Sequence, residues 1–401
     1  MPAADETRSP WTVFLIFLRL GLTSFGGPVA HIGFFRAEFV ERRGWLDEHT
    51  YADLVALCQF LPGPASSQVG MALGLTQAGY RGALAAWCGF TLPSALALIA
   101  LALGLVSLGD ALPTGLLHGL KIAAVAVVAQ AVWAMQKSLC PDAPRRVLGF
   151  LAAASALLFP AALTSPVIIA LAGLAGLALF RPGTERPATP LAVPIRKRAA
   201  VAWLTLFGAL LIGLPILAQS VESTTLARID AFYRAGSLVF GGGHVVLPLL
   251  QAEVVQPGWV DDNLFLAGYG AAQAVPGPLF TFAAFLGAAM GTAPQGVWGG
   301  LLCLLAIFTP SFLLIAGALP FWIRLRDNIS AQAALAGINA AVVGLLLAAF
   351  ITPVWTSAIH QPRDLGLALL ALLAGTRWKC PPWLVVTASA LSGALLAQAM
   401  V

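Results

Sequence analysis

A Pro-Gly-Pro triplet interrupts long apolar sequence twice in this chain, at matching places. It occupies residues 62–64 and returns at 276–278, preceded by Gln59 in the first case and by Gln273 in the second. Proline removes a backbone donor and glycine frees the backbone to turn, so a helix cannot continue through the triplet. In hydrocarbon, such a break is tolerated only where protein or a water-filled cavity surrounds it. The pattern therefore predicts a pair of broken helices within a membrane protein.

The composition supports a membrane protein. Of the 401 residues, 59% are hydrophobic and only 10% are charged, whereas a soluble domain carries roughly 25% charged residues. Apolar runs at 92–106, 122–134, 201–217 and 335–351 suit spanning helices. The fold class predicted is an all-α polytopic membrane protein. We assign the net charge of +5 to cytoplasmic loops facing anionic lipid and expect no nucleic-acid partner.

The chain is an internal duplication. The segment from Arg19 to Gly27 has its counterpart from Arg234 to Gly242, and Gly44-Trp45 returns as Gly258-Trp259. We predict a first repeat at 1–180 and a second at 225–401. Residues 181–224 lie between them and comprise a basic, proline-rich linker and an unpaired apolar helix at about 199–219.

The loop charges predict that the second repeat is inverted. Basic residues mark cytoplasmic loops, and the first repeat carries Arg36, Arg42 and Arg43 where the second has the acidic loop 253–262. Arg324 and Arg326 correspond to a loop of the first repeat, near residue 110, that lacks basic residues. We therefore expect a cytoplasmic N-terminus, a cytoplasmic linker at 181–198 and a periplasmic C-terminus.

Four segments are too short for two spans and broken in the middle, which predicts re-entrant helical hairpins. They are 11–25/29–40, 50–61/65–79, 225–240/244–256 and 262–275/279–291. About nine full spans remain, or roughly ten to thirteen if hairpins count as spans. We predict them at 82–108, 114–137, 146–160, 166–180, 199–219, 296–320, 330–352, 363–375 and 382–400.

The four breaks predict an anion site. A helix that begins within the membrane presents unsatisfied N–H groups and roughly half a positive charge, and interrupted segments at matching places point to a transporter site. Packing kinks are the alternative interpretation. The candidate substrate-binding residues are Arg19, Gly26, Gly27, Pro28, Gln59, Pro62, Gly63, Pro64, Ser66, Ser67, Gln68, Lys121, Arg234, Gly241, Gly242, Gly243, His244, Gln273, Pro276, Gly277 and Pro278.

Several of these side chains have a second interpretation. Arg19 and Arg234 either line the access to the site or extend toward the membrane surface. Lys121 either neutralises an anion or lies at a helix end. His244, like His31, either donates to an anion or proton path or packs in the interior. Because the sequence contains no HExxH, GxSxG, Walker loop or CxxC, we expect no enzyme activity, metal or cofactor.

The motifs resemble those of the chromate ion transporter family. The resemblance rests on FLRLGLTSFGGP at 17–28, GWL at 44–46, QFLPGP at 59–64, RAGSLVFGGGH at 234–244 and QAVPGP at 273–278. It implies a two-domain, long-chain member of the bacterial inner membrane that exports chromate and confers resistance, with the proton motive force as driving force. The family also includes single-repeat proteins that work in pairs, which leaves a homodimer open.

Other functions stay open at this point. Sulfate is a tetrahedral dianion like chromate, and backbone donors discriminate poorly between the two. An anion channel could use the same helix starts. An intramembrane chromate reductase is disfavoured by the lack of a redox cysteine pair.

Overall fold

The computed structural model describes residues 9–109, 114–161, 164–180 and 195–398. Every regular element within these ranges is a helix, so the all-α prediction is confirmed. The loop near residue 110, nearly all of the linker and the last three residues lie outside the described ranges.

The helices of the first repeat begin and end close to the predicted breaks. The longest, α4, is not straight, because its backbone leaves the helical region at Ala78 and Gly79. Gly74 and Gly82 come into contact there, so the chain doubles back between the predicted hairpin arm and the predicted span. The elements are α1 (Pro10–Thr23), α2 (Gly27–Arg36), η1 (Ala37–Arg42), α3 (Glu48–Phe60), α4 (Ala65–Leu108), α5 (Thr114–Leu139), α6 (Ala143–Leu158) and α7 (Thr164–Leu179).

The second repeat follows α8 (Lys197–Ser220), the unpaired helix. Its two inner half-helices begin with a 3-10 turn instead of a regular α-helical turn. The elements are α9 (Thr224–Leu238), η3 (Gly243–Val245), α10 (Val246–Val254), α11 (Asp262–Ala272), η4 (Leu279–Thr281), α12 (Phe282–Ala289), α13 (Gly296–Ala318), η5 (Leu319–Phe321), α14 (Trp322–Arg326), α15 (Ile329–Ala349), η6 (Phe350–Trp355), α16 (Thr356–Ala358), α17 (Pro362–Thr376) and α18 (Pro382–Gln398).

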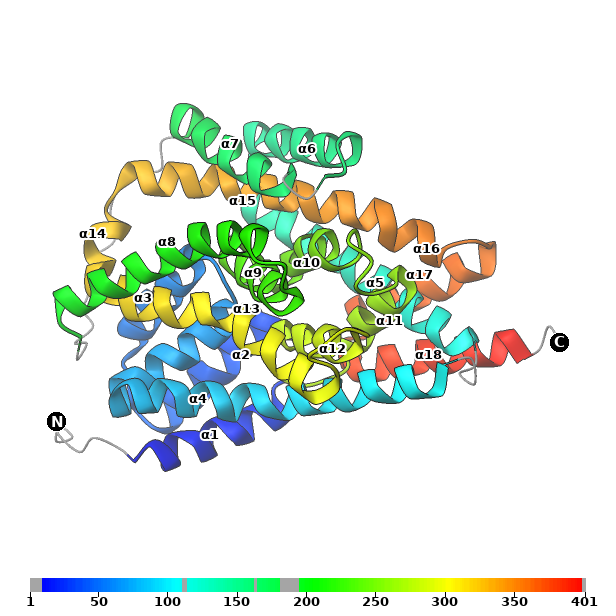
Figure 1. The fold of residues 1–401 in the computed structure, drawn as a ribbon, viewed down its shortest axis with the longest axis horizontal. Helices are drawn as coiled ribbons and strands as arrows, with labels where there is room; N and C mark the ends of the chain where they lie inside the picture. Colours follow the sequence, from blue (N-terminus) through cyan, green and yellow to red (C-terminus); the bar gives the residue numbers. More distant parts are fainter. Residues whose placement is uncertain (1–8, 110–113, 162–163, 181–194, 399–401) are drawn as a thin grey trace.

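The last two helices of each repeat pack against the other repeat. Helices α6 and α7 lie along α15, and α17 and α18 lie along α5 (Figure 1). Small residues allow these close approaches: Gly176 contacts Gly337 in one interface, and Gly115 contacts Gly393 in the other. The same kind of packing joins α1 to α4 through Gly21 and α9 to α13. The two predicted repeats therefore pack into a single interlocked helical bundle.

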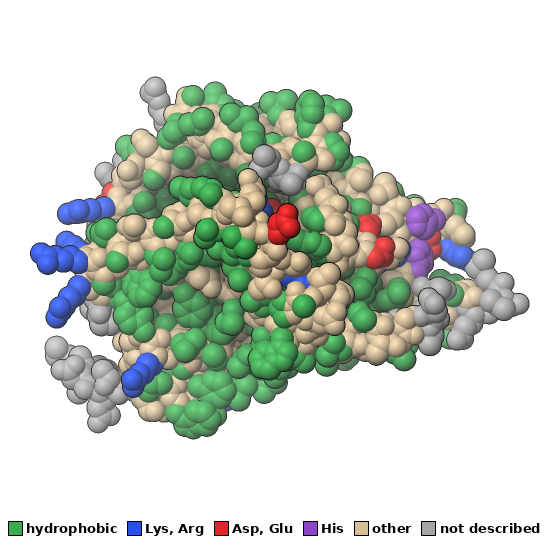
Figure 2. Space-filling model, in the orientation of Figure 1, with side chains coloured by type: hydrophobic (Ala, Val, Ile, Leu, Met, Phe, Trp, Pro, Cys, Tyr) green, Lys and Arg blue, Asp and Glu red, His purple; other side chains and the backbone are tan. Residues whose placement is uncertain are grey.

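The surface is that of a membrane protein. Five helices of the described chain are long and apolar enough to cross a membrane, namely Ala65–Leu108, Gly115–Leu139, Lys197–Ser220, Gly296–Phe321 and Ile329–Ala358. Apolar side chains cover much of the face in Figure 2, while basic side chains gather toward one end of the long axis and histidines toward the other. The remaining spans of the predicted nine correspond to shorter helices, so that count and the re-entrant placement stay predictions.

Candidate functional site

Four half-helices begin at the predicted breaks without a side chain capping their first turn. They are α2, α4, η3 with α10, and η4 with α12, and their N-cap residues are Gly26, Pro64, Gly242 and Pro278. By contrast, α1, α3, α9, α11 and α15 each begin with a capping side-chain oxygen. Helices α8 and α13 also lack one, but their starts are exposed and water can take its place.

These uncapped starts differ in their surroundings. Pro64 and Pro278 are buried, as is Gly243, the first residue of η3. Gly26 is exposed, and Val29 in the first turn of α2 is 85% exposed. Three starts thus lie within the protein, and the fourth opens outward. An anion is the natural partner for such donors, because the helix dipole adds its positive end.

The four breaks touch one another across the two repeats. The N–H of Gly63 donates to the carbonyl oxygen of Val239 at 2.7 Å, and the N–H of Gly277 donates to that of Ser24 at 2.9 Å. A Cβ added at Gly243 would lie 3.5 Å from Pro28. The two Gly-Gly breaks, at 26–28 and 241–243, therefore also meet. The breaks are therefore assembled as one unit.

We call the Pro-Gly-Pro triplets at 62–64 and 276–278 the first tip and the second tip. The backbone at both tips requires glycine. Gly63 has a φ of +119° and Gly277 a φ of +98°, which a residue with a side chain rarely adopts. A Cβ at Gly63 would lie 2.7 Å from the side chains of Gln68 and Ser311. One at Gly277 would lie 2.9 Å from Ser94. Both tips are thus too crowded for any larger residue.

Polar side chains concentrate around the first tip. His31 lies 3.3 Å from the Ser66 hydroxyl and 3.1 Å from the Ser24 carbonyl, and the Gln68 amide donates to the Pro62 carbonyl at 2.7 Å. Across the described residues, the buried oxygen atoms without a hydrogen-bond partner include four here: Ser24 Oγ, Ser67 Oγ, Gln68 Oε1 and Ser311 Oγ. The hydroxyl groups in this set are free to donate to a ligand.

The second tip is more apolar and better satisfied. Thr281 donates its hydroxyl hydrogen to the Pro278 carbonyl at 2.7 Å, and His244 lies 2.9 Å from the Tyr269 hydroxyl. Phe280 is fully buried beside them. The free hydroxyl donors therefore lie mainly at the first tip, although the buried Nε2 of Gln273 at the second tip also lacks a hydrogen-bond partner among the described residues.

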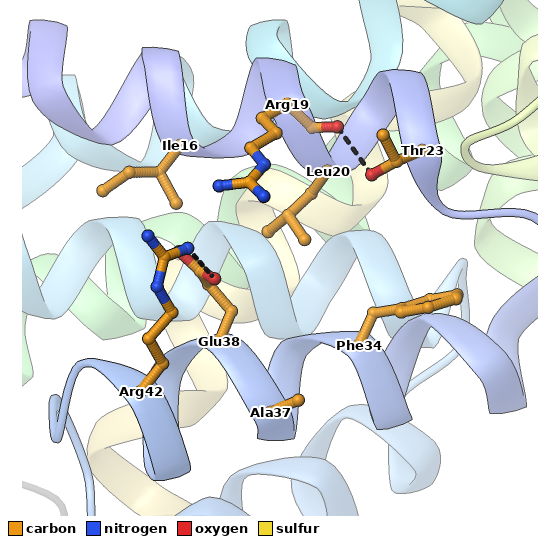
Figure 3. Close-up of a pocket in the computed structure, with 8 residues that line it drawn as sticks. All are labelled: Ile16, Arg19, Leu20, Thr23, Phe34, Ala37, Glu38 and Arg42. Carbon is orange, nitrogen blue, oxygen red and sulfur yellow. Dashed lines mark hydrogen bonds and ion pairs between the residues drawn. The ribbon is translucent and has the colours of Figure 1, made fainter.

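The two matched arginines have different surroundings. Arg234 forms ion pairs with Asp230 at 2.8 Å and Glu253 at 2.9 Å. Arg19 is exposed and lines a cavity of about 410 Å³ between α1 and α2/η1, together with Glu38 and Arg42 (Figure 3). Arg19 thus lies along a cavity, whereas Arg234 is held by two carboxylates.

Two further candidates lie apart from the tips or face outward. The Lys121 ammonium donates to Asn263 Oδ1 and to the Ser357 carbonyl, each at 2.9 Å, and so joins α5 to α11 and α16. The Gln59 side chain precedes the first tip but is exposed, while Gln273 is half-buried. The structure brings together the breaks and Ser66, Ser67 and Gln68, and it gives Lys121 partners of its own.

The sequence interpretation overlooked three hydroxyl groups near the tips. Ser24 belongs to the first Gly-Gly motif, and Ser94 and Ser311 follow the repeated Pro93 and Pro310. The duplicated Pro-Ser dipeptide was therefore the signal that could have revealed the last two residues. From the sequence alone the dipeptide indicates only a helix kink. The structure adds that Ser94 lies beside Gly277 and Ser311 beside Gly63.

Comparison with known proteins decides the family. The model of the family described as "Chromate transporter" matches residues 11–177 and 226–394. The chain belongs to the chromate transporter family. No solved structure matches it.

Relatives of this chromate transporter family member span one or both of the matched stretches. The chain is 29% identical over 395 residues to the "Chromate transport protein" of Pseudomonas aeruginosa, covering 96% of this chain and 92% of that protein. It is 27% identical over 391 residues to the protein of the same name from Cupriavidus metallidurans, covering 94% and 90%. The "Uncharacterized transporter YwrA" of Bacillus subtilis is 29% identical over 174 residues, which are 41% of this chain and 93% of that protein.

Proposed function

We propose that this chain is a secondary carrier that exports chromate across the bacterial inner membrane and thereby confers chromate resistance. The observation that carries the proposal is the meeting of four uncapped helix starts at one place. Chromate is a tetrahedral dianion, and converging N–H groups suit its oxygen atoms. We choose chromate among such anions because two relatives are named chromate transport proteins.

Chromate accumulation in cells tests the proposed site. We expect cells that express Pro62→Ala/Pro64→Ala to accumulate several-fold more chromate than wild-type cells, because alanine lets the helix continue and removes the free start of α4. Pro215→Ala is the matched control, since Pro215 lies inside α8, outside both repeats. A double variant that is well expressed and still excludes chromate as the wild type does would refute the site.

Sulfate is the nearest competing substrate. Since the donors at the tips are mostly backbone N–H groups, we expect sulfate to compete with chromate for transport. If the protein transports sulfate and does not transport chromate in the same vesicles, sulfate replaces chromate as the proposed substrate.

The proton motive force is the proposed driving force, and proteoliposomes distinguish this carrier from a channel. We expect the chromate flux to saturate as the chromate concentration rises. We also expect chromate to accumulate against its concentration gradient when a proton gradient is imposed. Large voltage-driven current without proton coupling would identify an anion channel.

We also propose that the second repeat is inverted in the membrane. Helix α1 begins at one end of the long axis and α18 ends at the other (Figure 1), which supports a cytoplasmic N-terminus and a periplasmic C-terminus. The two stretches matched by the family model support the division into repeats at 1–180 and 225–401. A reporter active only in the periplasm should give a signal at the C-terminus and none within 181–198, whereas equal signals at both places would refute the inversion.

A further inference from the structure

The charged residues beside the cavity between α1 and α2/η1 pair differently from their counterparts among the described residues of the second repeat. Glu253 takes the place of Glu38 in the second repeat, in the same alignment that matches Arg234 with Arg19. In the second repeat this carboxylate pairs with the matched arginine at 2.9 Å. In the first repeat Glu38 pairs instead with Arg42 at 2.9 Å and Arg43 at 2.6 Å.

The sequence explains why Arg19 has no carboxylate partner among the described residues. The residue four positions before Arg234 is Asp230, which forms its second ion pair, but the residue four positions before Arg19 is Leu15. The carboxylate of Glu38 is already held by two other guanidinium groups. Among the described residues, Arg19 forms no ion pair, and its side chain extends toward Glu38 and Arg42 across the cavity (Figure 3).

The cavity leads toward the first break. On α1 it is lined by Ile16, Arg19, Leu20 and Thr23, which share one helix face. Thr23 ends α1 and lies three residues before Gly26, the N-cap of the α2 start. At about 410 Å³ the cavity has the size of a small-molecule site. Two guanidinium groups and one carboxylate line it, so its charged side chains carry a net positive charge.

We propose that this cavity is a second oxyanion-binding site, in which Arg19 and Arg42 hold the anion at the mouth of the pathway before it reaches the helix starts. The proposal rests on the proposed function. Guanidinium groups bind tetrahedral oxyanions through paired N–H donors, and a positive mouth raises the local concentration of the anion. Glu38 limits the affinity, so that the anion can leave for the next site.

Chromate transport as a function of chromate concentration tests the cavity in the full-length protein reconstituted in phosphatidylcholine vesicles. We expect Arg19→Gln and Arg42→Gln to raise the half-saturating concentration about tenfold each and to leave the maximal rate within about twofold. Arg19→Lys, which keeps the charge, should give an intermediate value. Glu38→Gln should act in the opposite direction and lower the half-saturating concentration.

Arg36→Gln is the matched control, because Arg36 lies on the same hairpin but pairs with Glu41 and Glu48 and does not line the cavity. An unchanged half-saturating concentration in both Arg19→Gln and Arg42→Gln would overturn the second site and leave the proposed function intact. A wild-type protein that moves no chromate would overturn the proposed function itself.

The phosphate of an anionic lipid headgroup offers the same chemistry, and the choice of lipid separates the two sources. Phosphatidylcholine vesicles provide no anionic headgroup, so an effect of Arg19→Gln in them supports the free oxyanion. An effect that appears only after phosphatidylglycerol is added would overturn the proposal.

Discussion

The backbone N–H of Gly63 donates to the carbonyl oxygen of Val239 at 2.7 Å, so the first Pro-Gly-Pro tip is fixed by the second repeat. The N–H of Gly277 donates in the same way to the carbonyl of Ser24. Each bond joins a tip of one repeat to a residue just before the Gly-Gly break of the other. Neither repeat can therefore position its own tip alone, and a change at one tip must affect both.

Substitution of either tip glycine should stop transport. We expect Gly63→Ala and Gly277→Ala each to lower stability by about 1–3 kcal/mol, since alanine is strained at a positive φ and its Cβ meets neighbouring side chains. Chromate export by vesicles and thermal unfolding in detergent measure the two effects. Gly104→Ala in α4 is the control, because a Cβ there meets nothing within 4 Å, and equal behaviour of all three variants would contradict the prediction.

The hydroxyl of Ser67 should bind the anion without supporting the fold. Ser67 is 3% exposed and its Oγ has no partner among the described residues. A hydrogen bond to a charged group contributes about 1.5–3 kcal/mol, so Ser67→Ala should raise the half-saturating chromate concentration by at least about tenfold. Its unfolding temperature should stay that of the wild type.

Thr281 provides the matched comparison in the second repeat. It occupies the position of Ser67 when the two Pro-Gly-Pro triplets are aligned, but its hydroxyl already donates to Pro278 at 2.7 Å. Thr281→Val should therefore lower the unfolding temperature and change chromate affinity little. If Thr281→Val weakens chromate binding and Ser67→Ala lowers only the unfolding temperature, the hydroxyl that binds the anion lies on the second tip.

Arg234 should matter for stability far more than Arg19. Arg234→Gln leaves the carboxylates of Asp230 and Glu253, whose side chains are 9% and 12% exposed, without their cation. We expect a loss of about 3 kcal/mol, at the low end for buried pairs because Arg234 itself is 22% exposed. Unfolding temperatures of Arg234→Gln and Arg19→Gln test this directly, and equal values would show that the two ion pairs contribute nothing.

The sequence predicted the breaks because proline and glycine act on the backbone wherever they stand. The helices accordingly end at Thr23 and Phe60 and begin again at Gly27 and Ala65. Partner choice between helices could not be predicted in the same way. The Gly and Ala faces of α5 and α15 suit any small-residue helix, so nothing local indicated that each would pack against the other repeat.

The site was predicted in part for a similar reason. The in-register breaks indicated where N–H groups would be left free, since helix geometry alone determines this. Whether each arginine forms an ion pair depends on carboxylates elsewhere in the sequence. Arg19 and Arg234 occupy the same position in their repeats, yet Leu15 in place of Asp230 and the extra Arg42 and Arg43 change their surroundings.

Lys121 should support the assembly of the helices and leave chromate affinity unchanged. Its ammonium group donates to Asn263 and to the Ser357 carbonyl, and the side chain is 8% exposed. Lys121→Gln should lower stability by about 1.5–3 kcal/mol through the loss of these charge-assisted hydrogen bonds. A tenfold rise in the half-saturating chromate concentration at unchanged stability would instead place the anion beside Lys121.

Asp47 should stabilise the protein in a pH-dependent way, because it caps α3, the helix that leads to the first tip. Its carboxylate accepts hydrogen bonds from the Thr50 N–H at 2.9 Å and the Thr50 hydroxyl at 2.8 Å, and the backbone N–H in particular lowers the pKa of Asp47 below its usual value. A lowered pKa in the folded state means that the contribution is complete above about pH 4 and is lost as the pH falls further.

We expect Asp47→Ala to cost about 1 kcal/mol at pH 7 and less at pH 3, which lies below the usual pKa of an aspartate. Asparagine caps helices about as well as aspartate but does not titrate. The unfolding temperature of Asp47→Asn should therefore exceed that of Asp47→Ala by a similar margin at both pH values. If the margin of Asp47→Asn also vanishes at pH 3, the loss arises elsewhere in the protein and Asp47 is not the titrating cap.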